Sequence, residues 1–221
     1  AGLDPDDPPT TLAEVREAAE AIKEAGVIDT PPVVHELAAW KTEFWLTGAK
    51  IPFVNNNNGR DAPATESVVN SPEALELFEW LDAMNDDGLM LPVTNVPGQI
   101  DHYLALANQQ TSFGVEASSA ATSVEAFLRG ELSAGELTED GRVNADVDLS
   151  GLEIDADEFP GIDGPGHIQV GGGVYYMMST TPPEVQAAAW DFMKWVNTID
   201  MQAISNHEGG NDPVLVIIAE D

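Results

Sequence analysis

The segments of this chain that resemble strands are few, and they lie far apart along the sequence. Residues 111–115 have the apolar and β-branched character of a short strand, and residues 168–178 form a longer apolar segment with glycines and two tyrosines. More than 50 residues separate the two segments, and helical patterns occupy most of the rest of the chain. Strands separated in this way are joined by long crossovers, which favour parallel pairing. We therefore predict an α/β fold with a parallel or mixed sheet.

Capping signals and apolar spacing place the helices. Thr11 and Glu14 have the spacing of a capping box, and Gly26 predicts the end of that helix. We expect helices at residues 11–25, 31–46, 71–88, 99–109, 183–197 and 201–206, and a tight polar loop at residues 55–59. The apolar spacing predicts these buried faces: Leu12, Val15, Ala19 and Ile22 in the first helix, and Leu75, Phe78, Leu81 and Met84 in the third.

The charge balance excludes several classes of partner. The chain has 221 residues, with 39 acidic and only 8 basic side chains, and a formal net charge of -31. Nucleic acid binding requires cationic side chains to neutralise phosphates, and adsorption to an anionic membrane requires them too. No apolar run is long enough to cross a bilayer, so we expect no direct membrane insertion by this segment. The acidic surface also suggests a salty medium that screens its repulsion.

Motifs for catalysis are absent from the sequence. The chain contains no cysteine, so it has no thiol nucleophile and no Cys-based zinc site. Its four histidines are scattered without metal-ligand spacing, and no G-x-S-x-G elbow or P-loop occurs. Acidic residues are so frequent that no carboxylate pair stands out for acid–base chemistry. We expect a non-enzymatic protein without a cofactor.

A calcium loop is one alternative. Asp146, Asp148, Ser150 and Asp157 occupy oxygen-ligand positions of such a loop, and Gly151 takes its glycine position. Glu153, however, stands where an EF-hand loop needs an apolar residue, and a solvated acidic loop explains the same residues. An acidic extracellular calcium-binding or interaction module therefore remains the alternative function, and no metal ligands are assigned.

Several motifs, in this order, resemble a known family. They are the opening residues 1–14, residues 42–53 with the asparagine loop after them, residues 113–119, the glycine segment at residues 171–177 and the aromatic segment at residues 188–196. The set resembles the extracellular solute-binding proteins of ABC importers, in the branch for sugars and glycerol phosphates. Asn211 and Asp212 depart from the pattern, because the family usually has a tyrosine in this turn.

The resemblance implies an architecture and a function. Residues 1–221 would form a single helix-rich second lobe of a two-lobed periplasmic-binding-protein-like fold, with the first lobe and the C-terminal part absent. The protein would bind a sugar, an oligosaccharide or a glycerol-phosphate-like solute and deliver it to ABC permease subunits without catalysis. Its location would be periplasmic or extracellular, which is compatible with a lipid anchor on the full-length protein.

The same resemblance implies ligand contacts on two small-residue segments. Ser118 and Ser119 precede a predicted helix, where hydroxyls and free N–H groups suit sugar hydroxyls or a phosphate. Helix capping is the alternative role for these serines. Gly171, Gly172 and Gly173 would let the backbone approach a ligand, whereas a β-bulge or a close strand contact would explain them structurally.

A third set of contacts is aromatic. The family often carries a stacking aromatic in the segment where Trp40 stands, with His35 and Trp45 near it in the sequence. Trp40, Phe44 and Leu37 would share one stripe of the predicted helix, so core packing is the alternative. Tyr175 alternates with Tyr176 on the predicted strand, so only one of the two rings can face a cleft, and Tyr175 is our candidate.

Overall fold

The computed structural model describes residues 1–94, 102, 105–106, 109–116, 129, 154–168, 171 and 173–209, and side chains up to residue 205. The chain divides into two compact units. The first comprises residues 1–116 and 132–169, and the second comprises residues 117–131 and 170–221. Each unit is described below by itself.

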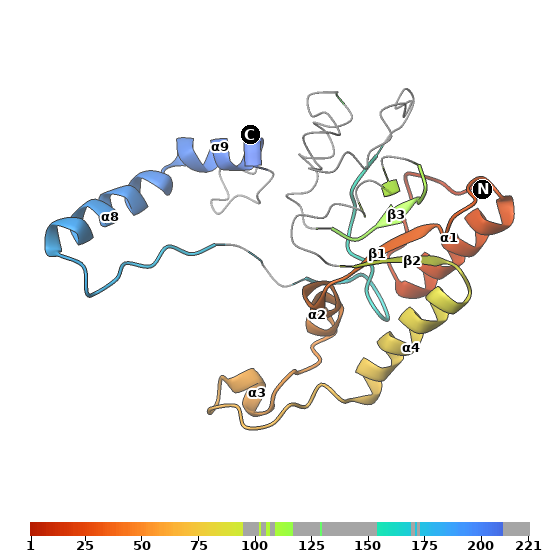
Figure 1. Ribbon diagram of the computed structural model, residues 1–221, viewed down its shortest axis with the longest axis horizontal. Coiled ribbons are helices and arrows are strands. Elements are labelled where there is room, and N and C mark those ends of the chain that lie inside the picture. Colours follow the sequence, from red (N-terminus) through yellow and green to blue (C-terminus); the bar gives the residue numbers. More distant parts are fainter. Residues whose placement is uncertain are drawn as a thin grey trace. The chain divides into compact units, whose positions relative to one another are not determined.

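The first unit is built on a three-stranded parallel sheet (Figure 1). Its strands are β1 (Val33–Leu37), β2 (Met90–Thr94) and β3 (Phe113–Gly114), in the order β2-β1-β3. Val33 pairs with Met90 on one side and with Phe113 on the other, and both pairings are parallel. The predicted α/β class with a parallel sheet is confirmed, and so is the strand within residues 111–115.

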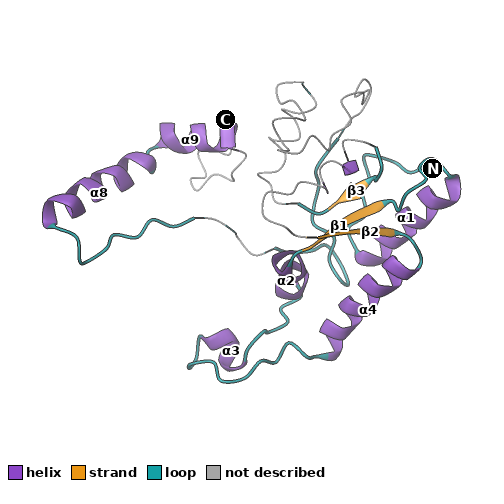
Figure 2. Cartoon of the chain, in the orientation of Figure 1, coloured by secondary structure: helices purple, strands orange, loops and turns teal. Residues whose placement is uncertain are grey.

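One described helix of this unit precedes β1, and the three others lie between β1 and β2. They are α1 (Leu12–Ala25), α2 (Ala39–Gly48), the short α3 (Asn55–Gly59) and α4 (Pro72–Asp86) (Figure 2). The capping box at the start of α1 is present, since Thr11 accepts from the N–H of Glu14 and the Glu14 carboxylate accepts from the N–H of Thr11. Gly26 ends the helix with a φ of 63°. The predicted apolar face of α1 is buried as expected.

The single helix predicted at residues 31–46 is wrong. Residues 33–37 form the central strand β1, and the helix α2 begins only at Ala39. Val33 and Val34 are β-branched, and a strand with a neighbour on each side buries both of them fully. The predicted stripe is lost with the helix, because Leu37 is 58% exposed. The buried face of α2 contains Trp45 instead.

The predicted buried face of α4 is wrong in part. Leu75 and Phe78 are about half exposed, whereas Leu77 and Met84 are fully buried. Apolar residues occupy two neighbouring stripes of this helix, one with Leu75 and Phe78 and one with Leu77 and Met84. Spacing alone therefore does not decide which stripe faces the core. The tertiary contacts decide it, since Leu77 packs in a cluster with Leu12 and Trp45.

The polar loop at residues 55–59 is a left-handed turn. Asn56, Asn57 and Asn58 have φ values of 56°, 55° and 54°, a conformation that asparagine tolerates better than most residues. The Asn58 side-chain oxygen accepts hydrogen bonds from the N–H groups of Phe53 and Val54, at 2.8 and 3.1 Å. The predicted tight loop is confirmed. The Asn58 side chain takes the place of a backbone carbonyl as the hydrogen-bond acceptor for two N–H groups of this loop.

The second unit contains α8 (Pro183–Val196) and α9 (Ile199–Gly209), which confirms both predicted helices. The strand predicted at residues 168–178 is wrong for the described residues of that range, which are exposed and in no strand. An extended segment becomes a strand only when a neighbour takes up its backbone hydrogen bonds, and the described residues offer it none. The helix predicted at residues 99–109 lies mostly outside the described residues.

A pair of leucines on α4 tests this core. Replacing the fully buried Leu77 with alanine should destabilise the protein by about 2–5 kcal/mol, because the substitution leaves a cavity. The matched variant Leu75→Ala, at a position that is 54% exposed, should cost less than about 1 kcal/mol. Urea unfolding measures both changes, and equal losses would contradict the observed face of α4.

Candidate functional site at the carboxyl edge of the sheet

The carboxyl ends of β1 and β3 lie at one edge of the sheet, since the strands are parallel neighbours. In open α/β sheets, ligands bind outside this edge. The chain leaves β1 through Ala38 into α2, and it leaves β3 through Val115 and Glu116. These two connections are the described parts of the candidate site.

Among the described residues, the amino end of α2 lacks the usual side-chain cap. Its N-cap is Ala38, which provides no side-chain hydrogen bond, and its first turn contains no acidic residue. The four other described helices of ten or more residues each carry an acidic residue there: Glu14, Glu73, Glu184 and Asp200. Free N–H groups and the positive end of the helix dipole favour hydroxyl or phosphate oxygens.

Trp40 stands in the first turn of α2 and is partly exposed. Its ring meets Phe44 edge to face, with 5.2 Å between the ring centroids. The ammonium of Lys41 lies 5.1 Å from the centre of the Trp40 ring. The indole is therefore packed against the protein and still reaches the surface at the carboxyl edge, as a stacking residue requires.

Beside Trp40 lies a buried cluster of four charged or titratable side chains, which we name the Lys41 cluster: Glu36, Lys41, His102 and Glu116. The Lys41 ammonium is 3.1 Å from a Glu36 carboxylate oxygen and also pairs with Glu116. His102 Nε2 lies 3.0 Å from the Glu116 carboxylate. The sequence analysis did not identify this cluster. Its one local signal is that Lys41 stands among the largely apolar residues 38–46, which also include Thr42 and Glu43.

Electrostatics explains why this cluster is tolerated. Burial raises the pKa of Glu116, but hydrogen bonds from His102 and Lys41 and the charge of Lys41 outweigh burial, so the pKa falls below its ordinary value. Glu36, His102 and Glu116 also offer ligand atoms within 4.8 Å of one another, as a metal site would. The Lys41 ammonium already contacts both carboxylates, as a metal cation would in such a site.

His35 lies behind the edge, within the core. It is 3% exposed, and its ring packs against that of Trp45 with 5.4 Å between centroids. Burial, helped by the nearby positive charge of Lys41, lowers the pKa of His35 to about 4. The imidazole is therefore neutral at pH 7. Its predicted contact with a ligand stays a prediction.

The other predicted contacts fall in the second unit or outside the described residues. Ser118, Ser119 and Gly172 are not among the described residues. Gly171 and Gly173 have open space where a side chain would stand, so close packing does not explain these glycines within their own unit. Tyr175 is 59% exposed and meets Phe192 edge to face at 5.7 Å.

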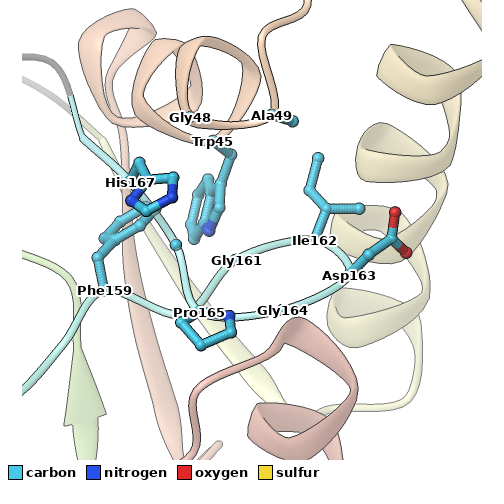
Figure 3. A pocket seen from close by; sticks show the side chains of 11 residues that line it. Trp45, Gly48, Ala49, Phe159, Gly161, Ile162, Asp163, Gly164, Pro165 and His167 are labelled. Atoms are coloured by element: carbon cyan, nitrogen blue, oxygen red, sulfur yellow. The ribbon is translucent and has the colours of Figure 1, made fainter.

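A separate cavity of about 200 Å³ lies at the carboxyl end of α2 (Figure 3). A glycine-rich loop at residues 159–167 encloses it against Trp45, Gly48 and Ala49. Its volume is below the usual range for ligand pockets. Of the residues named as candidate contacts, only the buried Trp45 lines it. The loop is anchored where the Trp45 ring N–H donates to the carbonyl of Pro160 at 2.9 Å. This cavity is therefore distinct from the candidate site.

Comparison with known proteins decides the family. The family model described as bacterial extracellular solute-binding protein matches residues 3–210. The chain belongs to this family. It is also 24% identical over 223 residues to the sn-glycerol-3-phosphate-binding periplasmic protein UgpB of Rhizobium meliloti (strain 1021). The match covers 100% of this chain and 46% of the relative, so the chain spans less than half the length of that protein.

Family membership confirms the resemblance drawn from the motifs. The family binds solutes outside the cytoplasm and is a transport component, not an enzyme. A calcium-binding or interaction module is not favoured, and residues 146–153 of the acidic loop lie outside the described residues. No helix among the described residues is long and apolar enough to span a membrane.

The buried His35 predicts a pH dependence of stability. The unfolded chain takes up a proton near pH 6.5, whereas folded His35 does so only near pH 4. Its contribution is therefore present above pH 6.5 and is lost as the pH falls towards 4, by about 3 kcal/mol in total. The lowered pKa of Glu116 also makes the folded protein lose stability as the pH falls below the ordinary pKa of a glutamate.

Urea unfolding at several pH values between 7 and 4 measures this effect. His35→Gln should flatten the loss of stability in this window, whatever its effect at pH 7. His167→Gln, at an exposed histidine, is the matched control and should keep the slope of the parent protein. An unchanged slope in His35→Gln would contradict the buried neutral imidazole.

Proposed function

We propose that this chain is the second lobe of a solute-binding protein that delivers a small polyhydroxylated solute to an ABC importer. The family match over residues 3–210 carries this proposal. The solute would be a sugar, an oligosaccharide or a glycerol-phosphate-like molecule. The similarity to a protein named for binding sn-glycerol 3-phosphate supports that class.

The carboxyl edge of the sheet would hold one side of the solute. Trp40 would cover an apolar face of the molecule, and the open N–H groups at the start of α2 would take its oxygens. Ser118 and Ser119 follow Glu116 closely along the chain and would add hydroxyls. Gly171 to Gly173, Tyr175 and His35 complete the proposed contact set.

The charges near Trp40 bear on the solute class. Lys41 is the nearest described cation, but Glu36 and Glu116 already neutralise it. A neutral sugar or polyol therefore fits this edge better than a dianion does. A phosphate group would depend on helix N–H groups and on cations elsewhere in the binding protein.

The proposed protein acts outside the cytoplasm, where its partners would be the solute and the permease subunits of the importer. A lipid anchor on the native protein would hold it near that permease. The proposed function is binding and delivery of the solute, without catalysis.

A thermal-shift screen of the native protein tests the proposed function. Sugars, polyols, sn-glycerol 3-phosphate, glycerophosphodiesters and calcium are each added in large excess. A solute about 100-fold above its Kd should stabilise by roughly 2.7 kcal/mol, or several degrees in Tm. A shift with calcium alone would contradict the proposal, and so would the absence of any shift.

Trp40 is the residue to test within the site. Trp40→Ala should weaken binding of the solute that the screen selects by about 5- to 30-fold, since it removes one stacking face worth roughly 1–2 kcal/mol. Trp190→Ala, at a tryptophan on α8 that is 55% exposed, is the matched control and should bind normally. Calorimetric titration measures both, and Ser119→Ala should also lose affinity. Normal affinity in both Trp40→Ala and Ser119→Ala would refute this site.

A further inference from the structure

Lys41 is the most completely buried large side chain at the carboxyl edge, with an exposure of 1%. Lys41 joins three elements. The residue belongs to the first turn of α2, and its ammonium lies 3.1 Å from a carboxylate oxygen of Glu36 on β1. The same ammonium pairs with Glu116, which follows β3. The ion pair with Glu116 crosses 75 residues of sequence. One side chain therefore ties together all the described parts of the candidate site.

Stability alone does not account for a buried lysine at this position. Removing an ammonium group from water is costly, and well-packed apolar residues often stabilise a core at least as well as a buried ion pair. In some proteins a buried ion pair instead specifies geometry, because both charges are satisfied only in one arrangement of the elements that carry them. In the Lys41 cluster that arrangement fixes the start of α2 against the ends of β1 and β3.

The same ammonium also acts on the aromatic residue of the proposed site. It lies 5.1 Å from the centre of the Trp40 ring, within the range of a cation–π contact. Phe44 holds the indole from another side, edge to face. Trp40 is thus oriented by one aromatic contact and one cationic contact, and the cation is itself held by two carboxylates.

We infer that Lys41 is a positioning residue for solute binding, which orients the Trp40 indole and fixes the exit of β3 without touching the solute. The expected effect of Lys41 on solute affinity rests on the proposed function. The structural part of the inference, the orientation of Trp40 by Lys41, stands on the contacts alone. His102 supports the arrangement through its contact with Glu116.

The test uses a variant that removes the positioning charge without leaving buried charges unpaired. In Glu36→Gln/Lys41→Met/Glu116→Gln the lysine and both glutamates lose their charges together and keep similar volumes, so the protein should fold with a Tm within about 5 °C of the parent. Lys50→Met, at an exposed lysine, is the matched control. Glu116→Gln alone keeps the pair with Glu36, and it provides the comparison if the triple variant does not fold.

The first measurement is fluorine NMR of the protein labelled with 5-fluorotryptophan, without solute. The chain has five tryptophans, and Trp40→Phe identifies the Trp40 resonance. This resonance should shift and broaden in the triple variant, shift less in Glu116→Gln and stay unchanged in Lys50→Met. The resonances of Trp190 and Trp195 should not move in any variant. An unmoved Trp40 resonance in both cluster variants would overturn the inference.

The second measurement is the Kd for sn-glycerol 3-phosphate by calorimetry on the native protein. The triple variant should bind about 5- to 10-fold more weakly, the size of one cation–π contact, at an almost unchanged Tm. Equal affinity would overturn the positioning role. If the parent protein does not bind this solute, glycerol phosphate is refuted as the cargo, and the Trp40 resonance still decides the inference.

Discussion

The parallel pairing of β1 on both of its sides is the interaction on which the first unit depends. It buries Val33 and Val34, and it brings β2 and β3 into one sheet although they are far from β1 in the sequence. Because both neighbours are parallel, the carboxyl ends of β1 and β3 share an edge. The start of α2 lies at that edge for the same reason. The central strand therefore places the candidate site as well as the core.

Local signals predicted the parts of this fold that are decided locally. The capping box at Thr11 and Glu14 and the glycine at Gly26 marked α1 correctly, since the groups that satisfy one another lie within a few residues. β1 was missed because its strand character comes from neighbours 57 and 80 positions away. The buried face of α4 was placed wrongly for a similar reason. Contacts with residues distant in the sequence, such as Leu12 and Trp45, decide which face of this helix is buried.

The site shows the same division. The family resemblance predicted Trp40 as a stacking residue, and the structure finds its side chain partly exposed at the carboxyl edge. The Lys41 cluster was not predicted, because Lys41 and Glu116 meet only in the folded chain and the family resemblance gives neither side chain a role. In a protein with a net charge of -31, two more glutamates carry no signal in the sequence. Their burial around a single lysine is what distinguishes them.

The central claim is that the solute binds at the carboxyl edge of the sheet, beside the first turn of α2. Hydrogen–deuterium exchange of the native protein, with and without the solute that stabilises it, tests this claim most directly. The account predicts slower exchange in the peptides that cover residues 38–41 and 115–119, and no change in residues 159–167 around the separate cavity. Protection confined to residues 159–167, with none at the start of α2, would contradict it.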